Sequence, residues 1–462
     1  MSLARQAIRA MRSLAPDGLP QAVATAARLH VLDAIGVGLA ASASSSGKVL
    51  VAFARDLPDG GASVFGRAQG ASAADAALVN GALIHSLEFD DTHMASIVHG
   101  SAVLASTALA MAERYAVSGA RLLSAYARGW ELLVRFGLAA PGEFQARGFQ
   151  VTSTAGALAA AAVAVELSAL DEEQSVNAVG IALSQASGVF EFLSNGSSVK
   201  SLHPGWAAHA GIMAAALARA GMSGPETALE GRFGLFASFA GDRAASDRFA
   251  ACLADLGSVW HLLDAAYKFY PCCHYLHPFI EAAGILRDRG ITADHIAQIV
   301  CRIAQPAALV VCEPWENKQH PKTGHAARWS LPIVVAARFI DGRIDMQTFA
   351  QLPSTAVREL ARRTLWEPLA DARFPERFEA ELLCETRDGT THRVRIDDVY
   401  GSANRPAHAT DVRAKFHANA ALVMTNTEVA NLETAVDGLD CVKDLNELTR
   451  ALRCATSGRA RG

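Results

Sequence analysis

The 462-residue sequence has no cysteine before Cys252, and none of its eight cysteines lies in a C-x-x-C spacing. This distribution argues against a disulfide framework or a cysteine zinc site, and it is typical of reduced thiols in a cytoplasmic protein. The phosphate-binding motifs G-x-x-x-x-G-K-[ST] and strand-led G-x-G-x-x-G are missing as well. These absences argue against nucleotide use, and the G-x-S-x-G elbow and the H-E-x-x-H zinc motif are absent too.

The chain also lacks a charge excess of either sign. Lys and Arg number 42 against 46 Asp and Glu, for a net charge of -4. No basic surplus indicates a nucleic-acid or anionic-membrane partner. The N-terminus is amphipathic rather than a signal peptide, and the most apolar stretch, 154–167, is shorter than the ~20 residues of a membrane span. We therefore expect a cytoplasmic protein with no nucleic-acid or membrane partner.

Apolar residues recur at helical spacing through the first half of the chain. Ser72-x-x-Asp75 and Asp171-x-x-Gln174 are capping patterns that mark two helix starts. The spacing predicts helices over 21–42, 72–85, 101–116, 119–136, 154–168, 171–189 and 206–220.

The pattern changes near residue 265. A strand is predicted over 294–303, and two alternating runs, 378–386 and 391–396, flank an Asp-Gly pair that is typical of a hairpin. Because the chain exceeds the ~250–300 residues of one core, two domains are expected. The predicted fold is mainly α: a large all-helical domain (1–266 and 406–462) and a smaller α+β lid domain (267–405).

The richest candidate site runs from His85 to His99, where carboxylates and imidazoles crowd the end of an apolar helix. Such crowding tunes pKa values and is common at functional sites. A charged helix end followed by a solvated loop explains each residue taken singly. Two Asp and a His could also bind a divalent ion, but the spacing matches no standard cage. Ser101 is the expected N-cap of the next helix, with free N–H groups that favour an anion beside His99.

Three further segments carry polar residues at predicted helix starts or at the domain junction. Residues 148–156 place Gln150 and three hydroxyls before an Ala-rich helix, and one hydroxyl is the expected N-cap. Lys200 precedes a turn that contains Pro204, where it is either a carboxylate-binding cation or a surface lysine. His274 and His277 are three apart at the junction, as buried structural histidines or as part of a ligand cleft.

Five motifs in order resemble the MmgE/PrpD family, which includes 2-methylcitrate dehydratase, cis-aconitate decarboxylase and iminodisuccinate epimerase. The resemblance covers about residues 20–420, and its motifs are Asn80-Gly…His85…Glu88-Phe-Asp-Asp-Thr92…His99-Gly, Gly148-Phe…Thr154-Ala-Gly, Lys200-Ser-Leu-His-Pro-Gly-Trp-Ala-Ala-His209, Glu230-Gly-Arg-Phe-Gly234 and Lys268-Phe-Tyr-Pro-Cys-Cys-His274.

The resemblance implies a homodimer, a cleft between a helical domain and a lid, and no metal or organic cofactor. It implies a small polycarboxylate substrate. The implied catalytic residues are His99, Lys200 and one of His274 and His277; the implied substrate-binding residues are Glu88, Asp91, Thr92, Gln150 and His203.

The sequence departs from the family pattern at three places. Position 88 is often Asp in the family, and Glu88 reaches one methylene further. Position 150 is often His, whereas Gln150 cannot act as an acid or base. The lid tyrosine of the decarboxylase branch has no clear counterpart near 310–312. We therefore expect dehydration of a 2-methylcitrate-like hydroxy-polycarboxylate, with an isomerase or epimerase, a decarboxylase and a non-catalytic carboxylate-binding protein as alternatives.

Family reactions develop charge on a carbon next to a carboxylate, so the site must supply a base and concentrated positive charge. His99 or His277 is expected to move the proton, and Lys200 with helix N-termini near Ser101 and Pro204 to hold the substrate carboxylates. Glu88 or the other histidine would protonate a leaving hydroxyl.

Overall fold

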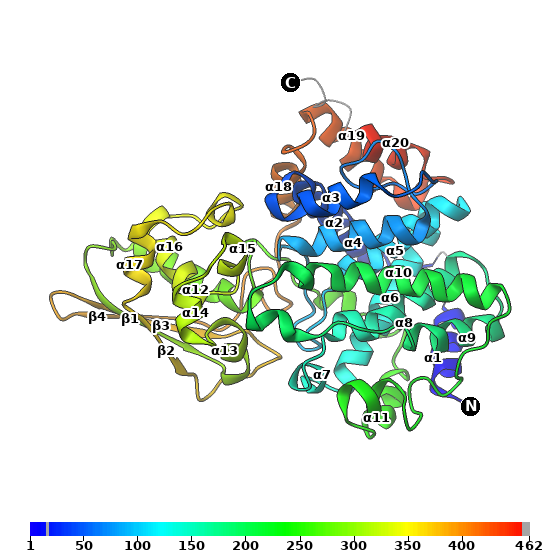
Figure 1. The fold of residues 1–462 in the computed structure, drawn as a ribbon, viewed down its shortest axis with the longest axis horizontal. Helices are drawn as coiled ribbons and strands as arrows, with labels where there is room; N and C mark the ends of the chain where they lie inside the picture. Colours follow the sequence, from blue (N-terminus) through cyan, green and yellow to red (C-terminus); the bar gives the residue numbers. More distant parts are fainter. Residues whose placement is uncertain (15–17, 455–462) are drawn as a thin grey trace. The chain divides into compact units, whose positions relative to one another are not determined.

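The computed structural model describes residues 1–14 and 18–454 of the chain (Figure 1). It divides into two compact units. The first contains residues 1–192, 198–265 and the segment from His408 onward; the second contains Leu193–Ser197 and Ala266–Ala407. A mainly helical fold with a smaller α+β part is therefore confirmed, because all four strands of the sheet lie in the second unit.

The first unit is built from helices, and each of the seven predicted ranges overlaps one of them. They are α1 (Leu3–Ser13), α2 (Gln21–Ala43), α3 (Ser45–Arg55), α4 (Ala73–Ser86), α5 (Gly100–Tyr115), α6 (Gly119–Ala139), α7 (Glu143–Ala146), α8 (Val151–Leu167), α9 (Glu172–Leu183), α10 (Leu202–Arg219), α11 (Ala245–Cys252), α18 (Ala409–Ala420), α19 (Asn426–Asp437) and α20 (Asn446–Cys454). The C-terminal α18 packs on α2, so both ends of the chain contribute to this unit.

Two local predictions were wrong. The N-cap of α8 is Gln150 rather than one of the hydroxyl residues that follow it, and no side chain hydrogen-bonds at that cap. The helix predicted over 171–189 stops at Leu183, after the capping box that Asp171 and Gln174 form at its start. The apolar pattern therefore located the helices but not their ends, which depend on tertiary contacts.

One helix in the described ranges, α2, is long and apolar enough to cross a membrane. It lies near the N-terminus, and 67% of its apolar window is buried inside the protein. Such burial is typical of the core helix of a soluble protein. The shorter apolar stretch noted in the sequence is α8, whose residues are almost all buried as expected.

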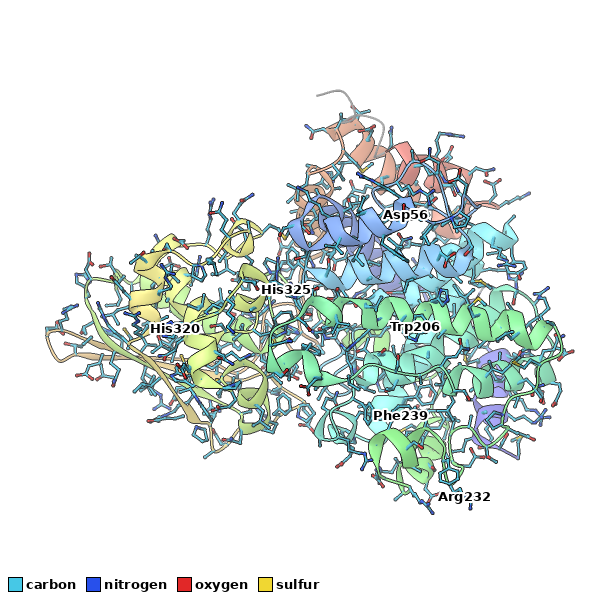
Figure 2. The ribbon with its side chains drawn as sticks, viewed as in Figure 1. Asp56, Trp206, Arg232, Phe239, His320 and His325 are labelled. Atoms are coloured by element: carbon cyan, nitrogen blue, oxygen red, sulfur yellow. The ribbon has the colours of Figure 1, made fainter. Side chains whose placement is uncertain are left out.

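Helices α4 and α10 approach each other unusually closely (Figure 1). A Cβ atom on Gly205 would lie 2.1 Å from the carbonyl oxygen of Leu78, and one on Gly81 would lie 2.8 Å from the Cα of Gly205. The next residue of α10, Trp206, reaches the surface, where it is 37% exposed and stacks on His209 (Figure 2). Only glycine fits at the contact between the two helices, which therefore meet backbone to backbone.

The second unit combines helices with a four-stranded sheet in the order β2-β1-β3-β4. β1 pairs in parallel with β2 and antiparallel with β3, and β3 and β4 form the predicted hairpin around Asp388-Gly389. The short β2 was not predicted. The elements are α12 (His277–Asp288), α13 (Gln305–Val311), α14 (Trp315–Gln319), α15 (Gly324–Ala327), α16 (Leu331–Asp341), α17 (Thr355–Ala361), β1 (Ile296–Ile303), β2 (Thr364–Pro368), β3 (Ala380–Thr386) and β4 (Thr391–Ile396).

Candidate active site

The loop between α4 and α5, residues 87–99, brings the acidic segment into the interior of the first unit. Glu88 adopts a left-handed conformation with φ of 53°, which few residues other than glycine adopt. Further along, His93 and Val98 form a two-residue β-bridge that closes the loop. Glu88, Asp90 and Asp91 are each no more than 3% exposed. The loop is therefore a buried structural element rather than a solvated connection.

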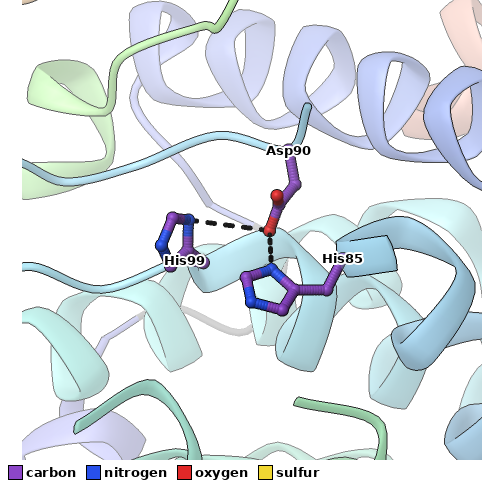
Figure 3. Close-up of side chains that lie close together, drawn as sticks. All are labelled: His85, Asp90 and His99. Atoms are coloured by element: carbon purple, nitrogen blue, oxygen red, sulfur yellow. Dashed lines mark hydrogen bonds and ion pairs between the residues drawn. The ribbon is translucent and has the colours of Figure 1, made fainter. Parts of the chain in front are cut away.

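A carboxylate between two imidazoles lies at the centre of the loop (Figure 3). His85 Nδ1 donates to Asp90 Oδ2 at 2.8 Å, and His99 Nδ1 lies 3.7 Å from the same oxygen. The two rings are 4.8 Å apart, edge to face. The side chains of His85 and Asp90 are fully buried, whereas that of His99 is 12% exposed. Of these three groups, His99 is the one that a substrate can reach.

Thr92 lies beside His99, as the sequence predicted for two residues of one site. The hydroxyl of Thr92 is 3.2 Å from His99 Nδ1, which also lies 3.1 Å from the backbone oxygen of Asp91. The backbone N–H of His99 donates to Thr152 at 3.0 Å. These contacts fix the imidazole through its Nδ1 side and its backbone N–H.

Lys200 is buried and pairs with Glu88, two residues that are far apart in the sequence. Its ammonium donates to Glu88 Oε1, and that same oxygen lies 3.7 Å from His85 Nε2. The Lys200 side chain is 9% exposed, so the surface-lysine alternative is wrong. A buried cation is costly unless a carboxylate compensates it, and Glu88 supplies that compensation.

Gln150 links two histidines. Its side-chain oxygen accepts from His203 Nδ1 at 2.6 Å, and its nitrogen donates to His85 Nε2 at 3.4 Å. Burial, with smaller contributions from His85 and Lys200, lowers the pKa of His203 to about 4. His203 is therefore neutral near pH 7, and the amide of Gln150 selects the tautomers of both rings by offering one donor and one acceptor.

Asp91 makes contacts within the protein through both of its carboxylate oxygens. One accepts from the backbone N–H of Ser101 at 3.1 Å; the other accepts from the Ser101 hydroxyl and from His30 Nδ1, the latter at 2.8 Å. The Ser101 hydroxyl also contacts Tyr126 at 2.6 Å, where burial and then Asp91 raise the tyrosine pKa. These contacts indicate a positioning role for Asp91 rather than direct contact with substrate.

The predicted N-cap at Ser101 was wrong. Helix α5 begins at Gly100 with His99 as its N-cap, and Asp91 accepts the N–H of Ser101. The carboxylate of the protein thus occupies the place that we had expected a substrate carboxylate to take. The start of α5 is thus already occupied by Asp91, and the cation of this cluster is the buried Lys200.

His274 and His277 lie in the second unit, at the junction of a short 3₁₀ turn and α12. Both are buried, and their rings are 4.7 Å apart. His274 packs on Phe378 and His277 on Tyr270, in each case edge to face. The pair is therefore a local arrangement of aromatic and imidazole rings whose catalytic role remains a prediction.

Sequence reasoning placed His85 and Asp90 in the candidate segment without giving them a role, and it missed His30 altogether. The five-residue spacing of His85 and Asp90 spans a helix end, and it becomes a contact only because Glu88 turns the chain. His30 comes from the middle of α2 and has no local signal at all. A search for buried polar residues on apolar helices would have found His30 and Asp33 together.

One group in this cluster has the composition of a metal site. Ligand atoms of His85, Asp90 and His99 all lie within 4.8 Å of one another. However, Asp90 Oδ2 already accepts from His85. The ammonium of Lys200 is also close, because it binds Glu88 Oε1, which lies 3.7 Å from the other ring nitrogen of His85. A neighbouring cation and a carboxylate already engaged by its own imidazole favour proton transfer over metal binding here.

Comparison with known proteins gives this arrangement a family. The MmgE/PrpD N-terminal domain model matches residues 7–247, and the MmgE/PrpD C-terminal domain model matches residues 270–440. The chain belongs to the MmgE/PrpD family.

Among relatives of this MmgE/PrpD chain are characterised lyases. Cis-aconitate decarboxylase from Mus musculus is 33% identical over 400 residues, covering 82% of this chain and 78% of the relative. The human enzyme of the same name is 31% identical, covering 82% and 79%, and that of Aspergillus terreus is 25% identical, covering 96% and 94%. The expectation of lyase-type chemistry fits these MmgE/PrpD relatives, whereas none of the three is named as a dehydratase.

Proposed function

We propose that this chain is a lyase that releases carbon dioxide from a small unsaturated tricarboxylate of the cis-aconitate type by acid–base chemistry. One observation carries the proposal: a buried cation, Lys200, is connected through Glu88 to the imidazoles of His85 and His99. The names of the family relatives supply the substrate class.

Decarboxylation has two requirements that this arrangement fits. The bond between the carbon skeleton and one carboxylate breaks, and its electron pair stays on the skeleton, conjugated with a remaining carboxylate. A proton then joins a carbon, so a trianion and one proton give a dianion and one molecule of carbon dioxide. The site must supply positive charge beside the remaining carboxylates and an acid for the carbon.

In this proposal a substrate carboxylate replaces the carboxylate of Glu88 as the partner of Lys200. His99 delivers the proton from Nε2 while Asp90 and Thr92 hold its other nitrogen. Gln150 and His203 orient the substrate by neutral hydrogen bonds. One of His274 and His277 is a second proton donor, and Asp91 keeps the loop in place.

The test is turnover by purified protein, with carbon dioxide release measured for cis-aconitate. A positioned acid contributes ~10²–10⁴-fold in rate, so His99→Asn and Lys200→Met should each lower kcat/KM by at least ~10²-fold. His320→Asn, at an exposed histidine of the second unit, should leave it unchanged. Activity near wild type in both site variants would reject these roles.

Dehydration of a hydroxy-polycarboxylate such as 2-methylcitrate is the second candidate. It is supported by Gln150, which occupies a position where the family often has histidine. Its amide hydrogen-bonds to His203 and His85 but cannot act as a general acid. A panel of polycarboxylates that includes cis-aconitate and 2-methylcitrate decides between the two candidates, because dehydration gives a new alkene absorbance without release of carbon dioxide. Deuterium uptake from D₂O without either product would favour an isomerase, and tricarboxylate binding by calorimetry without turnover would favour a non-catalytic role.

We also propose that the chain acts as a homodimer in the cytoplasm, as the family resemblance implies. Light scattering of the purified protein tests the dimer: a mass near twice the 48.6 kDa of one chain is expected. Fractionation of cells tests the compartment.

A further inference from the structure

A second group of imidazoles lies on the same loop, one residue after Thr92. His93 faces His261 from the short 3₁₀ helix η4 (His261–Asp264), with ring centroids 5.6 Å apart. His261 Nδ1 lies 3.8 Å from Asp264 Oδ2. One ligand atom from each of the three residues lies within 4.8 Å of the other two. All three residues belong to the first unit.

The backbone on both sides of this group is fixed. His93 exchanges hydrogen bonds with Val98 at 2.9 and 3.3 Å. On the other side, the carboxylate of Glu131 accepts the N–H groups of His261 and Leu262, both at 3.0 Å. Each imidazole is therefore carried by a backbone segment that local hydrogen bonds hold in place, a condition for a preorganised metal site.

The ring of His93 is oriented by a neighbouring hydroxyl. Its Nδ1 lies 2.8 Å from the Oγ atom of Ser96 and accepts the Ser96 backbone N–H at 3.3 Å, so metal binding at Nε2 requires the tautomer in which Nδ1–H donates to that hydroxyl instead. Metal-binding histidines in proteins usually have such a partner on the nitrogen that does not bind the metal.

The carboxylate completes a ligand set of known preference. The Asp264 side chain is 52% exposed, and its Oδ2 lies 3.8 Å from His261 Nδ1, beyond hydrogen-bond distance. Two imidazoles and one carboxylate suit zinc and neighbouring divalent transition metals rather than magnesium or calcium, which prefer oxygen ligands. Ligands on a tetrahedral zinc are about 3.3 Å apart, so the group must contract. The exposed Asp264 and partly exposed His261 can turn inward to do so.

We propose that His93, His261 and Asp264 form a binding site for a zinc-class divalent ion, with a fourth position open to water. The ion ties η4 to the loop that carries Thr92 and His99. Its role is to hold that loop, and the proposed lyase chemistry does not pass through it.

The test is zinc titration of the full chain, first stripped with a chelator, against a chromophoric competitor. We expect one tight zinc per chain in the wild type and a loss of at least ~10²-fold in affinity for His261→Asn, because removal of one of three ligands exceeds the effect of an outer-shell change. His320→Asn is the matched control, since this labelled histidine is exposed and lies in the second unit (Figure 2). Wild-type affinity and stoichiometry in His261→Asn would overturn the proposal.

Two further variants keep the test decisive. Asp264→Asn changes a half-exposed side chain that leaves the core intact, so it reports on the site even if His261→Asn does not fold, and a loss of at least tenfold in zinc affinity is expected. His99→Asn should keep the tight zinc. If His99→Asn loses the ion while Asp264→Asn keeps it, the ion binds at the catalytic cluster and the proposal is wrong. Zinc should also raise the Tm of the wild type but not of Asp264→Asn.

Discussion

The loop from residue 87 to 99 supports two clusters of imidazoles and carboxylates that differ in their surroundings. Around His85 and His99, three carboxylates are buried and accept hydrogen bonds from lysine, serine and histidine partners. Around His93 and His261, the carboxylate of Asp264 is half exposed, and that of Glu131 accepts backbone N–H groups. The first cluster is arranged to move protons and hold anions. The second is arranged to bind a cation.

The largest difference in activity between the two clusters is expected when one aspartate in each is changed to asparagine. Asp90→Asn should lower kcat by ~10²–10³-fold, because the amide no longer orients His85 or stabilises a charged His99, with KM little changed. Asp264→Asn, assayed without added metal, should stay within about twofold of wild type. Steady-state kinetics with cis-aconitate or the substrate found in the panel measures both.

A merely structural role for Asp90 would give a different result. It would lower Tm and the active fraction while the pH dependence of kcat/KM stayed the same. A positioning role predicts instead that the acidic and basic limbs of that profile move in Asp90→Asn but not in Asp264→Asn. Equal losses in the two variants would remove the functional distinction between the clusters.

A smaller effect is expected from Gln150→Leu, which has no counterpart in the second cluster. Leucine leaves His203 Nδ1 and His85 Nε2 without their amide partner, at a cost of about 1–3 kcal/mol for buried polar groups. Urea denaturation should show this loss of unfolding free energy. Gln150→His should recover part of it, because an imidazole can still bond to one of the two rings. An unchanged midpoint in the leucine variant would show that the amide contacts contribute little.

The smallest expected effect is a pH dependence of stability. The pKa of His203 in the folded chain, about 4, is below its ordinary value near 6.5, so the unfolded chain binds the proton first. The stabilising contribution is complete above pH 6.5 and is lost as pH falls toward 4, on the order of 1–3 kcal/mol. Denaturation between pH 7 and 4.5 should therefore show a smaller decrease in His203→Gln than in the wild type; identical slopes would assign the loss to other groups.

The sequence predicted the helices and the hairpin well, because Ala-rich apolar spacing and an Asp-Gly pair are local signals. It did not predict β2, whose five residues gain their strand conformation by pairing with β1. In the site, motif positions identified Glu88, Thr92, His99 and Lys200. The bond from Asp91 to Ser101 and the link from His85 through Gln150 to His203 depend on the left-handed turn at Glu88 and on helix packing, which no local pattern encodes.

The glycine contact between α4 and α10 has a consequence for how this chain can evolve. Glu88 follows α4 and Lys200 precedes α10. The distance between their charges is therefore set by the main-chain packing of the two helices at Gly81 and Gly205. Side chains around the pair are therefore free to diversify for new substrates while the distance between its two charges stays constant. Even one added methyl group at position 205 would push the two helices apart and so change the distance between Glu88 and Lys200 without replacing any charged residue.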